Sequence, residues 1–328
     1  MSVRQHLDGP YFDDLHVGQV LPSAPAVTIG PGETAAYQAI CGDPLAIACS
    51  RPLAEAVTGE PGQVVNPGLV LQFSIGQSTV ATRRVIANLF YRGVRLARTV
   101  RVGDTMSTTV EVRGMRENRR RPDRPPRGSV LLGIRTTDQE GRVVADYERC
   151  PMLGFRGTDE TGNDDDIGGP DVEADLAAWT AAVPPWDLGP LAPGGSWAVG
   201  EARRDPMRDT VTDALALVRL TQNQAAAHRD PALGLGGRRL VYGGHTIGLA
   251  QASLSRLLPS LATVLGWVSC DHTGPVFEGD VLGYEARLDA VLPVDNGVLM
   301  SMSVHVKAER DGITDDVLHW RPVVLAAA

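Results

Sequence analysis

The pattern of apolar and polar positions predicts two helices followed by four strands in the first half of the chain. A short helical stretch is expected at residues 34–39. An apolar helix then starts near Pro67, since proline suits the first turn of a helix. Runs of β-branched and apolar residues, each bounded by glycine, proline or charge, predict strands. These runs are residues 85–100, 107–112, 129–137 and 143–152.

The second half repeats this order of elements. A helical pattern covers residues 210–221, and a helix rich in small apolar residues follows at 244–258. Four more strand-like runs come next, at residues 264–270, 281–292, 298–306 and 317–325. An apolar helix followed by antiparallel strands, found twice, predicts the α+β class and indicates an old duplication.

An acidic, glycine-rich segment at residues 157–171 separates the two halves. Because it has almost no large apolar side chains, we expect it to be a surface linker. The predicted organisation is an N-terminal domain at residues 1–156, a linker at 157–190 and a C-terminal domain at 191–328. The 328 residues of the chain suffice for two domains with their own cores.

The most informative chemistry lies in the second half. Asn223 stands five residues before His228, and the pair Gly243 and Gly244 opens the apolar helix at 247–258. Histidine is the usual side chain for proton transfer near neutral pH. The first N–H groups of a helix have no partner inside the helix and can hold an oxyanion. The order predicts a proton-handling loop followed by an oxyanion site.

Here the sequence resembles the MaoC-like (R)-specific enoyl-CoA hydratases and, within them, the mesaconyl-CoA hydratase branch. The resemblance implies a double hot-dog fold, in which two antiparallel sheets each wrap around a central helix. His228 falls on the histidine of the family's signature loop, and Asn223 falls on its aspartate. Because an amide cannot accept a proton, His228 would carry the acid–base work while Asn223 orients water. The mesaconyl-CoA branch also has an amide here. The alternative is that His228 only caps a loop.

The glycine pair matches the family's oxyanion donor. Gly243 and Gly244 would let a thioester carbonyl approach backbone N–H groups, where the helix dipole favours negative charge. The alternative is that these glycines are needed only for the dihedral angles of a loop, and both interpretations can hold together.

Four further residues are candidates for substrate binding. Arg238 and Arg239 could bind the distal carboxylate of a dicarboxylic acyl-CoA, since arginine holds carboxylates with two parallel hydrogen bonds. They could equally be a solvated loop pair. Tyr242 could shape the pocket or belong to the core, and the role of His245 is open.

The first half resembles the same family but lacks the full loop. Asp43 is present, while Ala48 stands five residues later where the histidine would be. Residues 85–91 and 102–105 also resemble the mesaconyl-CoA branch. We therefore expect one active site per chain, in the second half, with the first half as a scaffold that helps form the acyl-CoA tunnel.

An arginine-rich loop between two predicted strands is a separate candidate. It could hold the CoA phosphates, but such a run is more typical of a solvated hairpin. Its members are Arg116, Arg119, Arg120, Arg121, Arg124 and Arg127.

Composition narrows the possible partners. The formal charge of −8 argues against nucleic acid or an anionic membrane as the main partner. Four cysteines without a Cys-x-x-Cys spacing argue against structural zinc and favour buried free thiols in a reducing compartment. A polar N-terminus and the absence of a long apolar run predict a cytoplasmic protein without a signal peptide or membrane span.

The predicted activity is the reversible hydration or dehydration of an enoyl-CoA thioester, and the resemblance implies mesaconyl-CoA or a related branched or dicarboxylic substrate. No metal and no cofactor beyond the CoA of the substrate is expected, and the resemblance implies a homodimer. Two alternatives remain: a non-catalytic acyl-CoA-binding protein, favoured by the amide at Asn223, and a hot-dog thioesterase. The thioesterase would need a carboxylate near the central helix, and none follows Gly244 within that helix.

Overall fold

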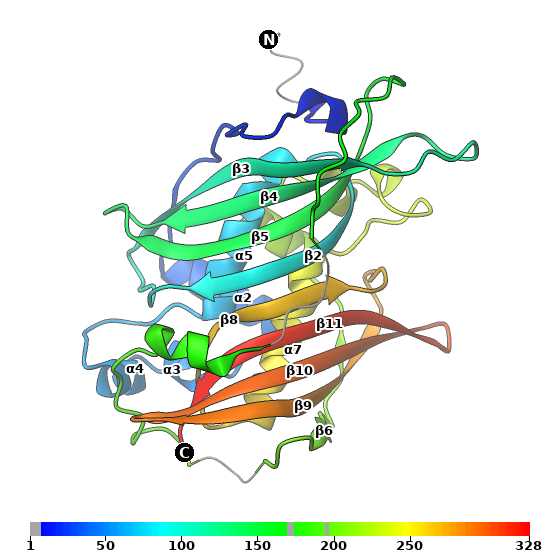
Figure 1. Cartoon of the computed structure of the whole chain (residues 1–328). Coiled ribbons are helices and arrows are strands. Elements are labelled where there is room, and N and C mark those ends of the chain that lie inside the picture. Colours follow the sequence, from blue (N-terminus) through cyan, green and yellow to red (C-terminus); the bar gives the residue numbers. More distant parts are fainter. Residues whose placement is uncertain (1–7, 169–173, 194–196) are drawn as a thin grey trace.

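The computed structural model describes residues 8–168, 174–193 and 197–328. Residues 169–173, which belong to the predicted linker, and residues 1–7 of the predicted N-terminal domain lie outside this range, as do residues 194–196. Within the described residues, eleven antiparallel strands form one sheet, with the main helices on one of its faces (Figure 1).

The first half contains the predicted helices and strands. The apolar helix begins at Pro67, and the earlier helix extends from Pro31 to Gly42, where a left-handed glycine ends it. In chain order the elements are η1 (Phe12–Asp14), β1 (Val27–Thr28), α2 (Pro31–Cys41), α3 (Ala46–Cys49), α4 (Arg51–Thr58), α5 (Pro67–Ser78), η2 (Thr79–Ala81), β2 (Val85–Leu96), β3 (Thr105–Glu117), β4 (Arg127–Thr137) and β5 (Val143–Gly154).

The second half also follows the prediction, except that its first helix is shorter. Asp213 has a φ of 55°, which a right-handed helix cannot include, so that helix begins only at Ala214. In chain order the elements are η3 (Leu176–Ala182), β6 (Ala202–Arg204), β7 (Asp209–Thr210), α6 (Ala214–Leu220), η4 (Ala226–His228), η5 (Pro231–Leu233), α7 (Gly243–Leu257), β8 (Leu261–His272), β9 (Val281–Val294), β10 (Gly297–Arg310) and β11 (Ile313–Ala326).

The predicted α+β double hot-dog fold is confirmed, and its two sheets join edge to edge. The strand order is β1-β3-β4-β5-β2-β8-β11-β10-β9-β6, with β7 paired to β9. At the junction, β2 and β8 run antiparallel, with Tyr91 opposite Cys270 and Val94 opposite Trp267. The two halves therefore share one continuous sheet (Figure 1).

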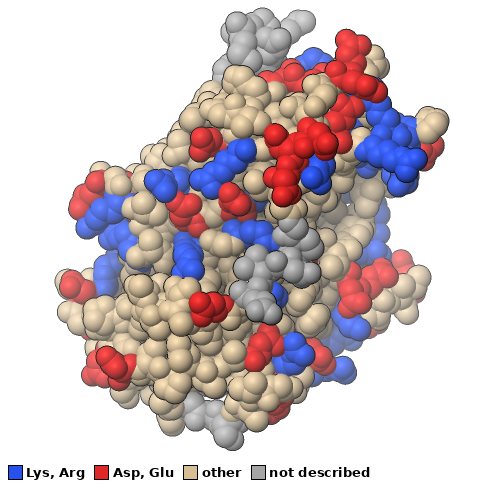
Figure 2. Space-filling view, in the orientation of Figure 1, with Lys and Arg blue, Asp and Glu red and all other residues tan. Residues whose placement is uncertain are grey.

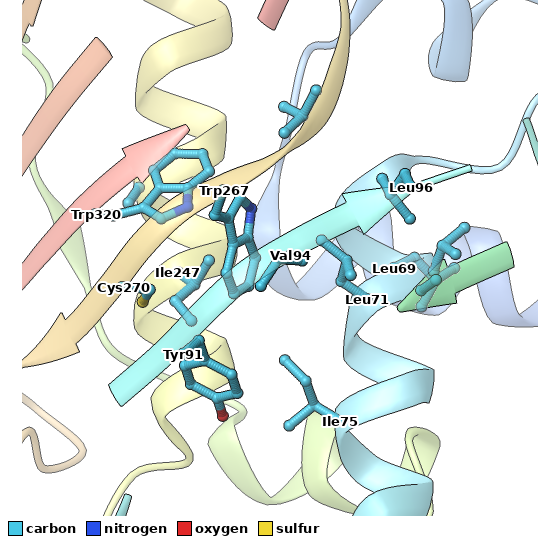
Figure 3. Packing of buried hydrophobic residues seen from close by; sticks show 14 of the residues in the cluster. Leu69, Leu71, Ile75, Tyr91, Val94, Leu96, Ile247, Trp267, Cys270 and Trp320 are labelled. Carbon is cyan, nitrogen blue, oxygen red and sulfur yellow. The ribbon is translucent and has the colours of Figure 1, made fainter. Parts of the chain in front are cut away.

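Helices α5 and α7 form the centre of the molecule. All twelve residues of α5 are buried, as are twelve of the fifteen in α7. A helix that is apolar or small on every side has to be enclosed on every side, which explains their position between the sheet and the outer helices. Figure 3 shows Ile247 of α7, Leu71 and Ile75 of α5, and Tyr91 and Trp267 of the junction strands meeting in one core.

The segment between the halves changes character along its length. Residues 157–166 are mostly exposed, whereas Ile167 is buried. The later part, from η3 onward, packs on the core through two tryptophans, Trp179 and Trp186. Arg95 of β2 places its guanidinium 4.1 Å from the centre of the Trp179 ring. Large apolar side chains return in this later part, and they hold it against the sheet.

The arginine-rich loop forms the hairpin between β3 and β4. Arg120 pairs with Glu117 at 2.7 Å, and Arg124 pairs with Asp123 at 3.3 Å. Arg116 lies 3.8 Å from Asp164 in the segment that follows β5. Figure 2 shows basic groups beside acidic ones on the face in view. Several of these arginines therefore form ion pairs within the hairpin or with the segment beside it.

The four cysteines are free thiols, with Cys41, Cys150 and Cys270 buried. Cys49 is exposed, so the expectation that all four are buried is wrong for this residue. Among the described residues, none of the helices has the length and apolar character needed to cross a bilayer.

Gly266 is required where the two halves join. Its φ is 154°, and a Cβ atom there would overlap with the carbonyl oxygen of Val94 on β2. Gly266→Ala is expected to lower the free energy of unfolding by about 3 kcal/mol, because the added methyl group forces the junction strands apart. Chemical denaturation measures this difference.

The matched control is Gly283→Ala in β9, where a Cβ would meet no atom within 4 Å and the backbone needs no special conformation. This variant should unfold within about 1 kcal/mol of the wild type. Equal stability of the two variants would show that the close approach at the junction is not a constraint.

Candidate active site

The site is built on the N-terminus of α7. Tyr242 is the residue before the helix, and its side chain does not cap the first turn. No hydrogen bond joins the amides of Gly243 and Gly244 to another described residue. Helix N-termini carry partial positive charge, so these two N–H groups form a donor site for an anionic oxygen.

The two glycines let neighbouring side chains come close to the helix. A Cβ at Gly243 would lie 2.5 Å from Cε1 of His272. A Cβ at Gly244 would lie 2.5 Å from Cζ of Tyr242 and would overlap with Oε1 of Gln72. Alanine at either position would therefore push these side chains away from the helix N-terminus.

His228 lies beside Tyr242, the residue that precedes this helix, and has a defined tautomer. Its Nδ1 lies 2.9 Å from the Leu240 carbonyl oxygen, which can only accept, so Nδ1 carries the proton and Nε2 keeps its lone pair. The Leu240 N–H donates to the Ala227 oxygen at 3.0 Å, which fixes the loop from the other side. The His228 ring lies 5.6 Å from that of Tyr242.

The electrostatic surroundings make His228 a neutral base. Burial lowers the pKa of His228 to about 4, the charges of Arg149 and Arg239 act in the same direction, and the hydrogen bond to Leu240 opposes them. The imidazole is therefore neutral at pH 7 and able to accept a proton at Nε2.

His272 is a second histidine of the site that the sequence did not reveal. It ends β8 and lies against Gly243, with its ring 6.1 Å from that of Tyr91. Burial lowers the pKa of His272 to about 4, and His228 adds to this effect. No spacing in the sequence links His272 to the signature loop, since the sheet alone brings it to the helix N-terminus.

Asn223 shapes the loop with its oxygen and keeps its amide hydrogens available. The side chain is fully buried, and Oδ1 accepts from the Ala225 N–H at 2.9 Å. Its backbone oxygen accepts from Nε of Arg229 at 2.9 Å. Nδ2 has no hydrogen-bond partner among the described residues. An unpaired buried NH₂ group is costly, so the geometry favours a water or ligand oxygen as its partner.

The first half holds this loop in place. The Gln224 N–H donates to Oγ1 of Thr79 at 2.7 Å, and the Ala226 N–H donates to the Arg83 oxygen at 2.9 Å. Thr79 and Arg83 follow directly after α5. The loop of the second half is thus positioned by the end of the first half's central helix.

The two arginines before the helix lie at the outer edge of the site. Arg239 forms an ion pair with Glu278, and its charge reaches His228. Arg238 is exposed, with its guanidinium 4.1 Å from the centre of the Phe277 ring. Each therefore already has a partner within the chain.

The other two candidates are buried. The Tyr242 hydroxyl has no hydrogen-bond partner among the described residues, and burial raises its pKa far above the ordinary value. His245 lies within the first turn of α7. Burial lowers the pKa of His245 to about 4, opposed by the charges of Asp213 and Glu278. Carboxylates therefore act on His245. Tyr242 instead lies beside His228.

In the first half the corresponding region is closed by side chains of both halves. At the start of α5, Oδ1 of Asn66 accepts the Gly68 N–H at 2.8 Å, so this helix N-terminus is capped. Asp43 is fully buried, and its Oδ2 accepts from Nδ2 of Asn66 at 2.8 Å and from Nε2 of Gln251 at 2.7 Å. The carboxylate of Asp43 thus forms hydrogen bonds within the core of the protein.

A metal centre of the usual composition is not found in the part of the chain that the structure describes. No group of three or more histidine, cysteine, aspartate or glutamate side chains there is arranged to hold an ion.

Comparison with known proteins gives relatives along nearly the whole chain, although no family model matches it. The chain is 28% identical over 303 residues to the mesaconyl-CoA hydratase of Cereibacter sphaeroides, a match that covers 88% of this chain and 86% of that protein. It is 30% identical over 296 residues to the beta-methylmalyl-CoA dehydratase of Chloroflexus aurantiacus, covering 84% of this chain and 80% of that protein.

Solved structures agree with these relatives. A conserved Mycobacterium tuberculosis protein described as a double hot-dog has a TM-score of 0.86 and 43% identity, covering 97% of this chain and 98% of that one. A Chloroflexus aurantiacus structure described as a MaoC-domain dehydratase has a TM-score of 0.82 and 25% identity, covering 98% of this chain and 99% of that one.

Fold and site together define a double hot-dog protein in which a histidine loop lies beside the residue that precedes an uncapped helix. The chain belongs to the MaoC-like hydratase and dehydratase family, in which mesaconyl-CoA hydratase and beta-methylmalyl-CoA dehydratase are its relatives. The family membership expected from residues 223–246 is thereby confirmed.

Three histidines with a lowered pKa predict how stability depends on pH. His228, His245 and His272 each have a pKa lowered from 6.5 to about 4, so the unfolded chain binds more protons than the folded one between these values. The free energy of unfolding should therefore fall as the pH drops from about 6.5 to about 4. Each histidine contributes a slope of up to about 1.4 kcal/mol per pH unit. Urea denaturation at a series of pH values measures this slope.

The control is His228→Gln, which removes one of the three groups and should make the slope shallower by about one third. Carboxylates whose pKa is lowered, such as Asp14 and Asp138, are present in both proteins, so their loss of contribution at low pH cancels in the difference between variant and wild type. A free energy of unfolding that stays constant down to about pH 4 would contradict the neutral state of these histidines.

Proposed function

We propose that the chain catalyses the reversible hydration of an enoyl-CoA thioester. The observation that carries the proposal is a neutral His228 beside Tyr242, which is followed directly by the two free amides of Gly243 and Gly244. A base for water and a donor site for a carbonyl oxygen are the two groups that this reaction needs. The names of the relatives, mesaconyl-CoA hydratase and beta-methylmalyl-CoA dehydratase, support the same chemistry.

In the hydration direction, the thioester carbonyl binds to the amides of Gly243 and Gly244. This withdraws electrons from the double bond and makes the β-carbon electrophilic. A water held by Nδ2 of Asn223 gives a proton to Nε2 of His228 as its oxygen bonds to the β-carbon. The negative charge moves to the thioester oxygen at the helix N-terminus. The imidazolium then returns a proton to the α-carbon, so that one water has been added.

This mechanism requires only that the substrate and a water are positioned and that protons are transferred. It uses no cofactor beyond the CoA of the substrate. Asn223 can serve because its role is to donate a hydrogen bond to water, while proton acceptance falls to His228. The closed region around Asp43 in the first half supports one active site per chain.

The acyl group we propose is that of mesaconyl-CoA or a related branched or dicarboxylic enoyl-CoA, on the strength of the relatives' names. We also propose a homodimer that works in the cytoplasm. The four free cysteines support a reducing compartment.

The direct test is incubation of the purified protein with mesaconyl-CoA, crotonyl-CoA and a longer enoyl-CoA, followed by mass spectrometry. We expect the mass of one water to be added while the CoA remains attached. Release of free CoA, detected with a thiol reagent, would instead identify a thioesterase. Binding of all three without any change in mass would identify a non-catalytic acyl-CoA-binding protein.

His228→Ala should lower kcat/KM by about 100- to 10,000-fold, since it removes the proposed base. Thermal unfolding should stay close to that of the wild type when both are compared at pH 7. The matched control is His16→Ala, because His16 is exposed and lies outside the site. Activity of the His228 variant equal to that of the control would overturn the assignment of the base.

A further inference from the structure

Arg149 is a buried cation whose charge no carboxylate balances. Its exposed fraction is 3%, and no carboxylate oxygen of a described residue lies within the 4.0 Å of an ion pair. Nη2 donates to the Ser78 oxygen at 3.2 Å and to Oγ1 of Thr82 at 2.8 Å, while Nε has no partner. Arg92, the other arginine buried to this degree, has Asp271 at 2.8 Å.

A buried guanidinium without an anion is energetically unfavourable. Removing a charge from water costs several kcal/mol, and neutral oxygens recover only part of this. The Ser78 carbonyl lies at the C-terminal end of α5, where the helix dipole provides about half a negative charge. The helix end therefore offsets the charge of Arg149 in part, and an anionic ligand would complete the balance.

The position of Arg149 connects it to the proposed site. It lies on β5 directly opposite Tyr91 of β2, and the Tyr91 ring is 6.1 Å from that of His272. His272 in turn lies against Gly243. Burial raises the pKa of Tyr91 to about 12, opposed by the charge of Arg149, and the same charge reaches His228. A short row of side chains thus leads from the helix amides to the guanidinium.

We infer that Arg149 binds the distal carboxylate of a short dicarboxylic acyl group whose thioester lies at the N-terminus of α7. The inference rests on the proposed function and names the feature of the substrate that the site selects. Arg238 and Arg239, the candidates from the sequence, have Phe277 and Glu278 as partners at the outer edge. Arg149 is inside, and a carboxylate can take the place of its missing counter-ion by accepting a charge-assisted hydrogen bond from Nε, which has no partner among the described residues.

If Arg149 had a purely structural role, its substitution would have a different effect on activity. It holds the turn after α5, and Thr79 in this turn receives the Gln224 N–H of the catalytic loop. If this were its whole role, a substitution would impair all substrates alike. Selectivity between acyl groups with and without a carboxylate is therefore the decisive readout.

The first experiment uses the wild-type protein and two saturated ligands that cannot be hydrated. Calorimetry should show that succinyl-CoA binds about 100-fold more tightly than butyryl-CoA, because only the former carries a distal carboxylate. Equal affinities would overturn the inference. Because no turnover is involved, this result is independent of whether the protein is a hydratase.

The second experiment compares kcat/KM for mesaconyl-CoA and crotonyl-CoA. Arg149→Met should lower the value for mesaconyl-CoA by about 100-fold relative to that for crotonyl-CoA, and Arg149→Lys should restore part of the ratio. The control Arg238→Met should leave the ratio unchanged. A ratio unaffected by Arg149→Met, or one lowered by Arg238→Met instead, would overturn the inference. Absence of hydration of either substrate by the wild type would refute the proposed function, while calorimetry of Arg149→Met with succinyl-CoA and butyryl-CoA would still decide the role of Arg149. Loss of the preference for succinyl-CoA supports the inference, and an unchanged preference overturns it.

Discussion

The antiparallel pairing of β2 with β8 is the contact on which the arrangement of the site depends. It turns two hot-dog sheets into one and requires the backbone of Gly266 to pass close to Val94. The same pairing brings Tyr91 and, through its neighbour strand, Arg149 of the first half next to His272 of the second. Both halves of the chain therefore contribute residues to the candidate active site, which the C-terminal half alone could not form.

The two central helices have similar surroundings, but their N-termini differ: that of α5 is capped by a side chain and that of α7 is not. Asn66 caps α5 and donates a hydrogen bond to the buried Asp43. Tyr242 precedes α7 without capping it, and the amides of Gly243 and Gly244 remain free. One end thus contributes to the stability of the core, and the other keeps unsatisfied donors for a substrate oxygen.

The helices and strands could be predicted because burial leaves a periodic trace in the sequence, as in the apolar run after Pro67. His228 and the glycine pair could be found because their loop is contiguous. His272 and Arg149 lie on strands far from that loop, and only the strand order of the sheet reveals their proximity. The ion pair of Arg239 with Glu278 depends equally on folding, since no spacing in the sequence links these two residues.

The central claim is that the free amides of α7 polarise a thioester carbonyl. Isotope-edited infrared spectroscopy of bound butyryl-CoA, labelled at the thioester carbonyl, tests it directly, because the ligand cannot react. The account predicts that the carbonyl stretch moves to lower frequency on binding, as hydrogen bonds from the helix N-terminus weaken the C=O bond. A bound ligand whose carbonyl frequency equals that in water or higher would contradict it.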